Sequence, residues 1–240
     1  MIDLRRRTRR DARPHGARVT WLLDLDNTLH DALVHIMPRI NRDMTDYVAR
    51  KLALSTEAAS ELRVRYWKRY GATLLGMIAH HRIDPHEFLW QTHRFPDMHV
   101  LVRRRASLVD AIRALPGRRI VLTNAPRHYA AAVLRALGLW SHLDGLVAIE
   151  HTAFAGRWQP KPSRQMLRRL LARLRTPAAR CVLVEDSPQN LAAAKACGMR
   201  TVLVSGISWR RRAGARPRAG RGRRIDVQVQ SALTLSRVRR

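Results

Sequence analysis

The sequence predicts a doubly wound α/β fold, in which a Rossmann-like parallel sheet carries helices on both faces. Three observations predict it. Short apolar runs rich in Val, Ile and Leu recur along the chain, as in strands buried on both faces of a parallel sheet. Helical patterns separate the later runs, which indicates βαβ units. A gap of about 90 residues after the first run indicates an inserted subdomain.

The predicted core elements follow one another in a regular order. The first strand is residues 19–25 (VTWLLDL), and a weak alternation at 225–229 (IDVQV) predicts an edge strand near the C-terminus. Glycines just past the last apolar residue end two of the helices, at Gly138 and Gly198. The other expected strands are 119–124, 145–149, 180–185 and 200–204, and the expected helices are 127–137, 162–174 and 188–197.

The long gap after the first strand does not fit one crossover helix. Its sequence is mostly helical, and the loop tip FPDM at 95–98 divides it. We expect a helical subdomain at 32–100, between core segments 19–31 and 101–208. The helical stretches lie near 32–51, 56–80, 85–94 and 100–115.

The net charge of +28 is concentrated in the two ends of the chain. Residues 1–18 hold seven Arg against two Asp, and residues 209–240 hold eleven Arg against one Asp. We expect both to be basic tails, disordered at 1–18 and 209–224. A GC-rich coding sequence would produce this arginine bias, and nonspecific contact with polyanions is the alternative interpretation.

Composition also narrows the cellular context. No apolar run reaches about 18 residues, so we expect no membrane span. The basic N-terminus lacks the apolar segment of a secretory signal. Cys181 and Cys197, the two cysteines, lie in apolar segments, as expected of reduced thiols in a cytoplasmic protein.

Polar side chains lie at the ends of three predicted strands and would meet at one edge of the sheet. Asp24 and Asp26 lie at the end of the first strand, where an isolated acidic pair is more often only a polar turn. In open α/β sheets, however, ligands bind beyond the carboxyl ends of the strands. Four acids around one point require a divalent cation, and oxygen ligands favour Mg²⁺. The candidate residues are Asp24, Asp26, Thr123, Asn124, Lys161, Glu185 and Asp186.

Lys161 stands out because arginine supplies most of the basic residues in this chain. Lysine occurs only at positions 51, 68, 161 and 195. Arginine is a planar fork and lysine a compact point charge, so the two are not interchangeable. We therefore expect a functional ammonium group at Lys161.

Four short motifs resemble, in order, those of the haloacid dehalogenase-like (HAD) superfamily. They are DLDNT, LTNA, PKPS and VEDSPQN, which begin at residues 24, 122, 160 and 184. The helical insert directly after the first motif is similar to the C1-type cap of that superfamily. Within the superfamily, residues 66–84 and 123–139 resemble pyrimidine 5′-nucleotidases.

The resemblance implies a role for each candidate residue. Asp24 would attack phosphorus and form an aspartyl-phosphate, and Asp26 would protonate the leaving oxygen and later deprotonate water. Lys161 would neutralise developing charge. Thr123, Asn124 and Lys161 would bind the phosphate group, and Tyr70 of the cap would stack on a base. The implied Mg²⁺ ligands are Asp24, Asp26 through its backbone carbonyl, Asp186, and Glu185 in an assisting role.

The function implied is a Mg²⁺-dependent phosphomonoesterase, with pyrimidine nucleoside monophosphates as the leading substrates. A dehalogenase is disfavoured, because carbon–halogen displacement needs no acid such as Asp26 for its leaving group. A mutase is harder to exclude, because it uses the same acid and differs in the cap. The alternatives are a phosphatase for another small metabolite, such as a sugar phosphate or pyridoxal phosphate, and a nucleic-acid-binding protein or polynucleotide-end phosphatase using the Arg-rich tails.

Overall fold

The computed structural model describes residues 3–4, 19–207 and 225–237. The chain divides into two compact units. The core unit consists of residues 1–31 and 102–240, and the helical insert consists of residues 32–101. No helix among the described residues is long and apolar enough to cross a bilayer.

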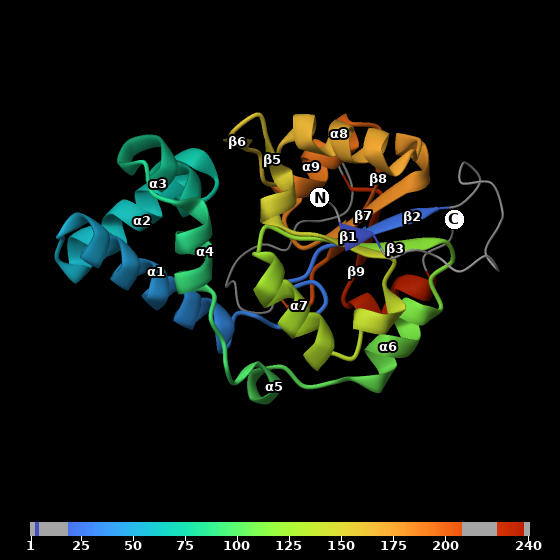
Figure 1. Ribbon diagram of the computed structural model, residues 1–240. Helices are drawn as coiled ribbons and strands as arrows, with labels where there is room; N and C mark the ends of the chain where they lie inside the picture. The colour runs from blue at the N-terminus through green and yellow to red at the C-terminus, as the bar shows by residue number, and fades with distance from the viewer. Residues whose placement is uncertain (1–2, 5–18, 208–224, 238–240) are drawn as a thin grey trace. The chain divides into compact units, whose positions relative to one another are not determined.

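A seven-stranded sheet forms the centre of the core unit, in the order β1-β4-β3-β2-β7-β8-β9 (Figure 1). Six strands are parallel, and β1 pairs antiparallel with β4 at one edge. Every residue of β2 and β7 is buried, as the apolar runs predict. The fold class is therefore confirmed. The strands are β1 (Asp3–Leu4), β2 (Thr20–Leu23), β3 (Arg118–Leu122), β4 (Gly145–Val147), β7 (Cys181–Glu185), β8 (Arg200–Val204) and β9 (Val227–Val229).

Helices cover both faces of this sheet. Figure 1 shows α8 (Arg164–Leu174) and α9 (Pro188–Ala196) on one face, and α6 (Ala106–Arg113) and α7 (Arg127–Ala136) on the other. Leucines at helical spacing on α8, such as Leu167, Leu170 and Leu174, pack into the same buried cluster as Leu22 and Leu183 of the sheet. This packing fixes the strand ends that carry the polar candidates.

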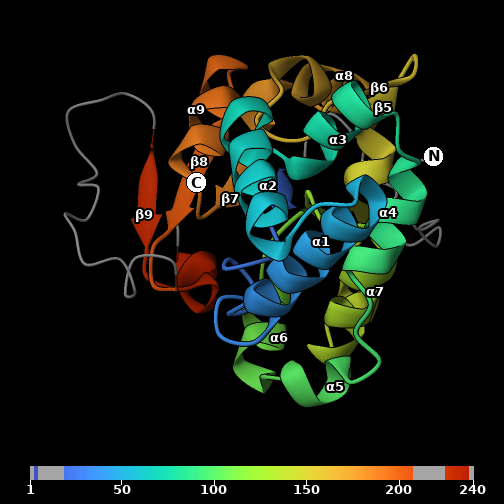
Figure 2. The same ribbon diagram turned by 90° about the vertical axis from the view of Figure 1, so that its left-hand side faces the viewer.

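The helical insert consists of five helices. Among them α1 packs against α2 and α4, and α2 packs against α3 (Figure 2). The predicted helix at 56–80 is in fact two helices, because Gly71 has a left-handed φ of 82° and ends the first one. The helices are α1 (Ile36–Leu52), α2 (Thr56–Tyr70), α3 (Thr73–His81), α4 (Pro85–Thr92) and α5 (Met98–Leu101).

Both ends of the chain contribute more to the fold than their composition predicts. Asp3 and Leu4 form β1, although we expected a disordered tail at 1–18. At the other end β9 adds the predicted edge strand, and a short 3₁₀ helix, η6 (Ala232–Arg237), follows it with Leu235 fully buried. Residues 225–237 are thus part of the core unit, because β9 pairs with β8 and the side chains of Ala232 and Leu235 are buried. The remaining tail residues, 1–2, 5–18, 209–224 and 238–240, lie outside the described residues.

A small hairpin was not expected from the sequence. The strands β5 (Ala153–Phe154) and β6 (Arg157–Trp158) pair antiparallel around Gly156, which has a φ of 73°. Two-residue strands are too short to show an alternating pattern. The hairpin lies just before the PKPS motif, in the core unit.

Candidate active site

The three central strands end side by side, and their next residues carry the site. Leu23 of β2 is in register with Val121 of β3 and Val184 of β7. The Asp24 amide donates to the Val184 carbonyl at 2.9 Å, so the chain is still tied to the sheet when it reaches the first acid. Parallel register therefore brings the first, second and fourth motifs to one edge of the sheet.

Lys161 joins two carboxylates in the interior of this edge. Its Nζ donates to Asp24 Oδ1 at 2.5 Å, to Glu185 Oε2 at 2.7 Å and to the Leu122 carbonyl at 2.9 Å. The exposed fractions of Asp24, Glu185 and Lys161 are 6%, 2% and 4%. The loop before α8 thus supplies an ammonium group to acids that follow β2 and β7.

The electrostatic balance of this group is negative. Burial and the neighbouring Glu185 raise the pKa of Asp24 to about 7, although Lys161 opposes the shift. Burial also raises the pKa of Glu185, with Asp186 adding to the effect. Burial alone would lower the pKa of Lys161, but Asp24 and Glu185 outweigh it and raise that pKa. Lys161 therefore stays charged, while the acids lack sufficient positive charge around them.

Asp186 completes a group of three acids. One carboxylate oxygen from each of Asp24, Glu185 and Asp186 lies within 4.8 Å of the others. Asp186 is partly exposed, at the entrance of α9, and the Ser187 amide donates to Glu185 Oε1 at 3.2 Å. Hard oxygen ligands at this spacing suit a divalent cation such as Mg²⁺. Three of the four acids predicted as ligands are thus brought together by their side chains.

Asp26 has a different set of partners. Its Oδ1 lies 2.6 Å from the Tyr129 hydroxyl and 2.9 Å from His30 Nε2. Burial and Asp26 raise the pKa of Tyr129 well above its usual value, so Tyr129 stays protonated and its hydroxyl donates a hydrogen bond to Asp26. The Asp26 carboxylate is not part of the three-acid group. The role expected of Asp26 at the metal was through its backbone carbonyl, and that stays a prediction.

Asn27 shapes the turn that places Asp26 beside His30. Asn27 has a left-handed φ of 63°, which Asn tolerates better than most residues. Its amide donates to the His30 carbonyl at 2.8 Å, and Asp26 and His30 form a β-bridge. Thr28 in the same turn donates to Asp24 Oδ2 at 3.1 Å. The turn therefore orients both acids of the first motif.

The second motif supports Lys161. Asn124 Nδ2 donates to the Lys161 carbonyl at 3.0 Å, and the Lys161 amide donates to Asn124 Oδ1 at 2.9 Å. Thr123 is buried, and its hydroxyl accepts from the Ala125 amide at 3.0 Å. Asn124 is thus a support for Lys161, and contact of either residue with substrate stays a prediction.

Tyr70 lies in the insert within a cluster of aromatic rings. Its hydroxyl lies 2.5 Å from His80 Nε2, and its ring centroid is 5.9 Å from that of Tyr66. Tyr66 in turn lies 2.8 Å from His81 Nε2 through its hydroxyl. Tyr70 therefore has ring partners within the insert, and its contact with a base stays a prediction.

Three residues that orient the acids of the site were not assigned a role in the sequence analysis. They are Thr28, His30 and Tyr129. Thr28 is four residues from its partner Asp24, and its place in DLDNT is a usable signal. Tyr129 is 103 residues from Asp26 along the chain, so only the packing of α7 against the strand ends reveals the contact.

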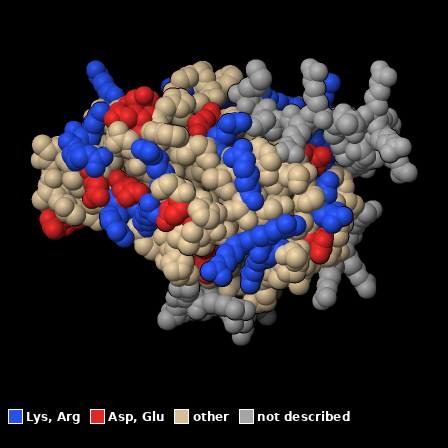
Figure 3. Space-filling view, turned by 60° about the horizontal axis from the view of Figure 1, so that its bottom comes forward, with Lys and Arg blue, Asp and Glu red and all other residues tan. Residues whose placement is uncertain are grey.

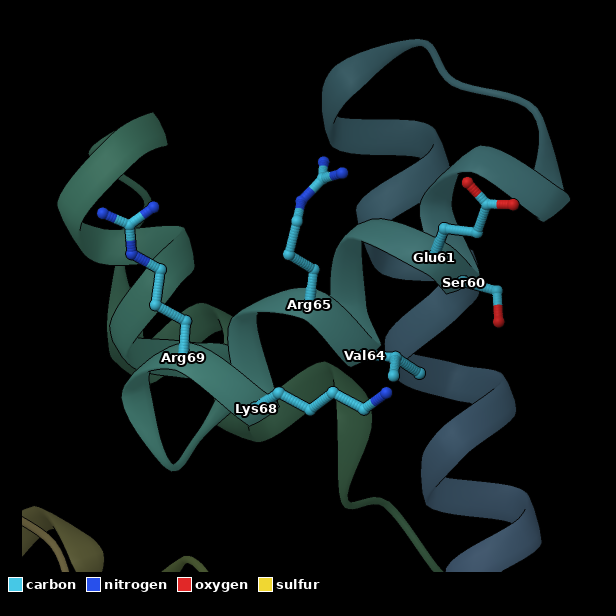
Figure 4. A pocket seen from close by; sticks show the side chains of 6 residues that line it. All are labelled: Ser60, Glu61, Val64, Arg65, Lys68 and Arg69. Carbon is cyan, nitrogen blue, oxygen red and sulfur yellow. The ribbon is translucent and has the colours of Figure 1, made fainter.

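Positive charge also gathers on α2 of the insert. A hollow of about 650 Å³ is lined by Arg65, Lys68 and Arg69 together with Glu61, Ser60 and Val64 (Figure 4). On one face of the molecule, Figure 3 shows Lys and Arg side chains covering more area than Asp and Glu. The polyanion contact predicted for the Arg-rich tails falls mainly on residues outside the described ones.

Most of the chain is similar in sequence to known proteins. A family model for haloacid dehalogenase-like hydrolases matches residues 20–198. A phosphoglycolate phosphatase of Cupriavidus necator is 32% identical over 196 residues, which cover 76% of this chain and 79% of that protein. One from Rhodospirillum rubrum is 29% identical over 204 residues, which cover 77% and 78%.

A solved structure is similar in fold. CbbY from Rhodobacter sphaeroides in complex with phosphate superposes with a TM-score of 0.59 at 21% identity. The match covers 91% of this chain and 96% of that one. At this identity the similarity concerns the fold alone.

Proposed function

The chain belongs to the haloacid dehalogenase-like hydrolase family, and from this premise we propose that it is a magnesium-dependent phosphomonoesterase for a small phosphorylated metabolite. The observation that carries the proposal is the buried group of Asp24, Lys161 and Glu185, with Asp186 beside it. It combines a carboxylate nucleophile, an ammonium group for a phosphate and acids for a cation.

The residues present fit a bound Mg²⁺. Lys161 contacts two of the three grouped carboxylates. Burial raises the pKa of Asp24 to about 7, so a further positive charge is needed to keep Asp24 ionised at neutral pH. Asp24 and Asp186 would hold the ion directly, with Glu185 and the Asp26 carbonyl assisting. The ion supplies charge neutralisation for the transferring phosphoryl group.

The first chemical step uses both acids of the DLDNT motif. A carboxylate oxygen of Asp24 attacks phosphorus, and the bond from phosphorus to the leaving oxygen breaks. Asp26 transfers its proton to that oxygen in the same step, so the alcohol leaves neutral. Thr28 and Lys161, which bond to the two oxygens of Asp24, hold the nucleophile in position.

The second step reverses the role of Asp26. As a carboxylate it takes a proton from water while the water oxygen bonds to phosphorus and the bond to Asp24 breaks. Phosphate leaves and both acids return to their starting states. Lys161 neutralises the developing charge in both steps, and Asn124 supports it through two hydrogen bonds.

Phosphoglycolate is the substrate that the relatives suggest. Two proteins named phosphoglycolate phosphatase each match about three quarters of this chain. Phosphoglycolate carries a carboxylate next to its phosphate ester. We propose a small phosphorylated carboxylic acid as the first substrate class.

Pyrimidine nucleoside monophosphates remain the second candidate. Tyr70 on α2 is the residue that favours them, because a flat base stacks on an aromatic ring that is only partly buried. Tyr70→Ala should then lower kcat/KM for UMP or CMP more than for a phosphate ester without a base. An equal loss on both substrates would assign Tyr70 to packing of the insert.

A phosphate-release screen tests the proposal. The protein is assayed with 2-phosphoglycolate, sugar phosphates, pyridoxal phosphate, UMP, CMP and AMP, each with Mg²⁺ and with a chelator. We expect turnover only with Mg²⁺, and the largest kcat/KM for 2-phosphoglycolate. A preference for UMP and CMP over AMP would support the second candidate. Absence of phosphate release from every ester would refute the phosphomonoesterase assignment.

A further inference from the structure

Asp26 is held by two side chains that come from different parts of the core unit. The Tyr129 hydroxyl donates to Asp26 Oδ1 at 2.6 Å, and His30 Nε2 lies 2.9 Å from the same oxygen. Tyr129 is 1% exposed and His30 8%. When Asp26 is ionised its carboxylate only accepts hydrogen bonds, so both groups then donate to it. Two donors on one oxygen fix the orientation of the carboxyl group.

The fold places each donor independently. The turn at Asn27 positions His30, because the Asn27 amide donates to the His30 carbonyl at 2.8 Å. Tyr129 lies in the first turn of α7, whose buried face also includes Ala130 and Val133. A buried polar group costs free energy unless it is hydrogen-bonded, so the buried phenol and imidazole both favour the position in which they bond to Asp26.

The hydrogen bonds also determine which oxygen of Asp26 carries a proton. In a protonated carboxyl group, the oxygen that accepts two hydrogen bonds is the carbonyl-like one. The transferable proton then belongs on Oδ2. Rotation of the carboxyl group, which would move that proton away from a leaving oxygen, requires both hydrogen bonds to break.

We propose that Tyr129 and His30 are positioning residues that hold the Asp26 carboxyl group for proton transfer to the leaving group. This inference rests on the proposed phosphomonoesterase function and deepens it. The proton passes from Asp26 to the leaving oxygen, and neither Tyr129 nor His30 gains or loses a proton. Their effect is therefore largest where the leaving group most needs a proton.

Tyr129→Phe tests this role, because it removes the hydroxyl and keeps the buried ring. Phenyl phosphate and 4-nitrophenyl phosphate have similar shapes, but phenoxide is the poorer leaving group. kcat/KM reports the step in which the leaving group departs. We expect a loss of about tenfold on phenyl phosphate and less than about threefold on 4-nitrophenyl phosphate, a fraction of the full effect of general acid catalysis. The ratio of the two values does not depend on the fraction of folded enzyme.

Matched variants separate positioning from packing. Tyr47→Phe removes a hydroxyl that donates to Glu87 at 3.3 Å in the insert, and it should leave the ratio unchanged. His30→Gln keeps a hydrogen-bond donor near the position of Nε2, whereas His30→Leu removes it. The ratio of the two kcat/KM values should therefore stay closer to wild type in His30→Gln than in His30→Leu. In an Asp26→Asn background, Tyr129→Phe should no longer change the ratio.

A thermal unfolding measurement tests the same assignment without catalysis. Tyr129→Phe should lower the Tm in the wild-type background but not in an Asp26→Ala background, where the hydroxyl has lost this acceptor. Equal losses on the two esters, or no loss, would overturn the inference. A wild-type protein that releases phosphate from neither aryl ester nor any ester of the screen would overturn the proposed function, and the positioning role would fall with it. If only metabolite esters are hydrolysed, the Tm comparison decides the inference, and an equal Tm loss in both backgrounds would overturn it.

Discussion

The acidic site of the core unit and the basic face of α2 in the insert carry charge in opposite ways. At the site, Asp24, Lys161 and Glu185 are almost fully buried and contact one another. On α2, Arg65 and Lys68 are exposed to solvent. Buried charges destabilise the fold when they lose their partners, whereas exposed charges are screened by solvent and contribute little to stability. We therefore expect the core to tolerate few substitutions and the insert many.

The largest expected effect is at Asp24, the proposed nucleophile. Asp24→Asn keeps the size of the side chain but removes the carboxylate that we propose attacks phosphorus, so turnover should fall by about 10⁴-fold or more. Steady-state phosphate release measures it, and circular dichroism checks that the fold is kept. Asp46→Asn, at an exposed acid of the insert, is the matched control and should change little. Comparable losses in both variants would break the contrast between the two units.

Removal of the buried ammonium group should destabilise the metal-free protein. Lys161→Met leaves Asp24 and Glu185 without their shared cation, which costs about 3–5 kcal/mol of unfolding free energy for a broken buried pair. Urea unfolding in the presence of a chelator measures the loss. Lys68→Met on α2 should stay within about 0.5 kcal/mol of wild type. If the two lysine variants unfold alike, the Lys161 pair does not stabilise the core.

Packing, rather than charge, should be the sensitive feature of the insert. A Cβ on Gly76 of α3 would lie 2.2 Å from Tyr66 Cγ, so Gly76→Ala should cost about 1–3 kcal/mol by overpacking. Thermal or urea unfolding measures the cost. In a Tyr66→Ala background the added methyl group has room and should cost much less. An equal cost in both backgrounds would mean that the contact with Tyr66 is not the cause.

The smallest effect concerns the C-terminal edge of the core. Burial alone would raise the pKa of Asp226, but hydrogen bonds from Lys195 and Thr201 outweigh it and hold that pKa below its usual 3.8. The group thus stabilises the fold above about pH 3.8, and this contribution is lost as the pH falls through the lower folded-state pKa. Asp226→Asn should cost about 1 kcal/mol or less at neutral pH.

Unfolding curves at several pH values check this prediction. The difference between wild type and Asp226→Asn should be constant at neutral pH and shrink in strongly acidic solution. A difference that grows as the pH falls would have the wrong sign, and it would show that Asp226 does not stabilise the attachment of β9.

The core sheet and the site motifs were predictable from sequence because they are local patterns. Apolar runs predicted β2, β3 and β7, and the polar residues after them followed from the rule that ligands bind at strand ends. Lys161 was recognisable because an arginine-rich chain uses lysine there. In each case the signal lies within a few consecutive residues.

The remaining features depend on contacts that no local pattern contains. Tyr129 reaches Asp26 only through the packing of α7, and Leu235 is buried by residues far from it in sequence. Gly71 divides a helical pattern that continues on both sides of it.

Detection of the phosphorylated intermediate tests the central claim most directly, namely that the chemistry occurs on Asp24. The enzyme is mixed with ³²P-labelled substrate and Mg²⁺, quenched in acid within milliseconds and mapped by peptide. We predict label on the peptide that contains Asp24, forming and decaying at rates consistent with turnover, and no label in Asp24→Asn. Rapid turnover with no label on that peptide, or with the label on another residue, would contradict the account.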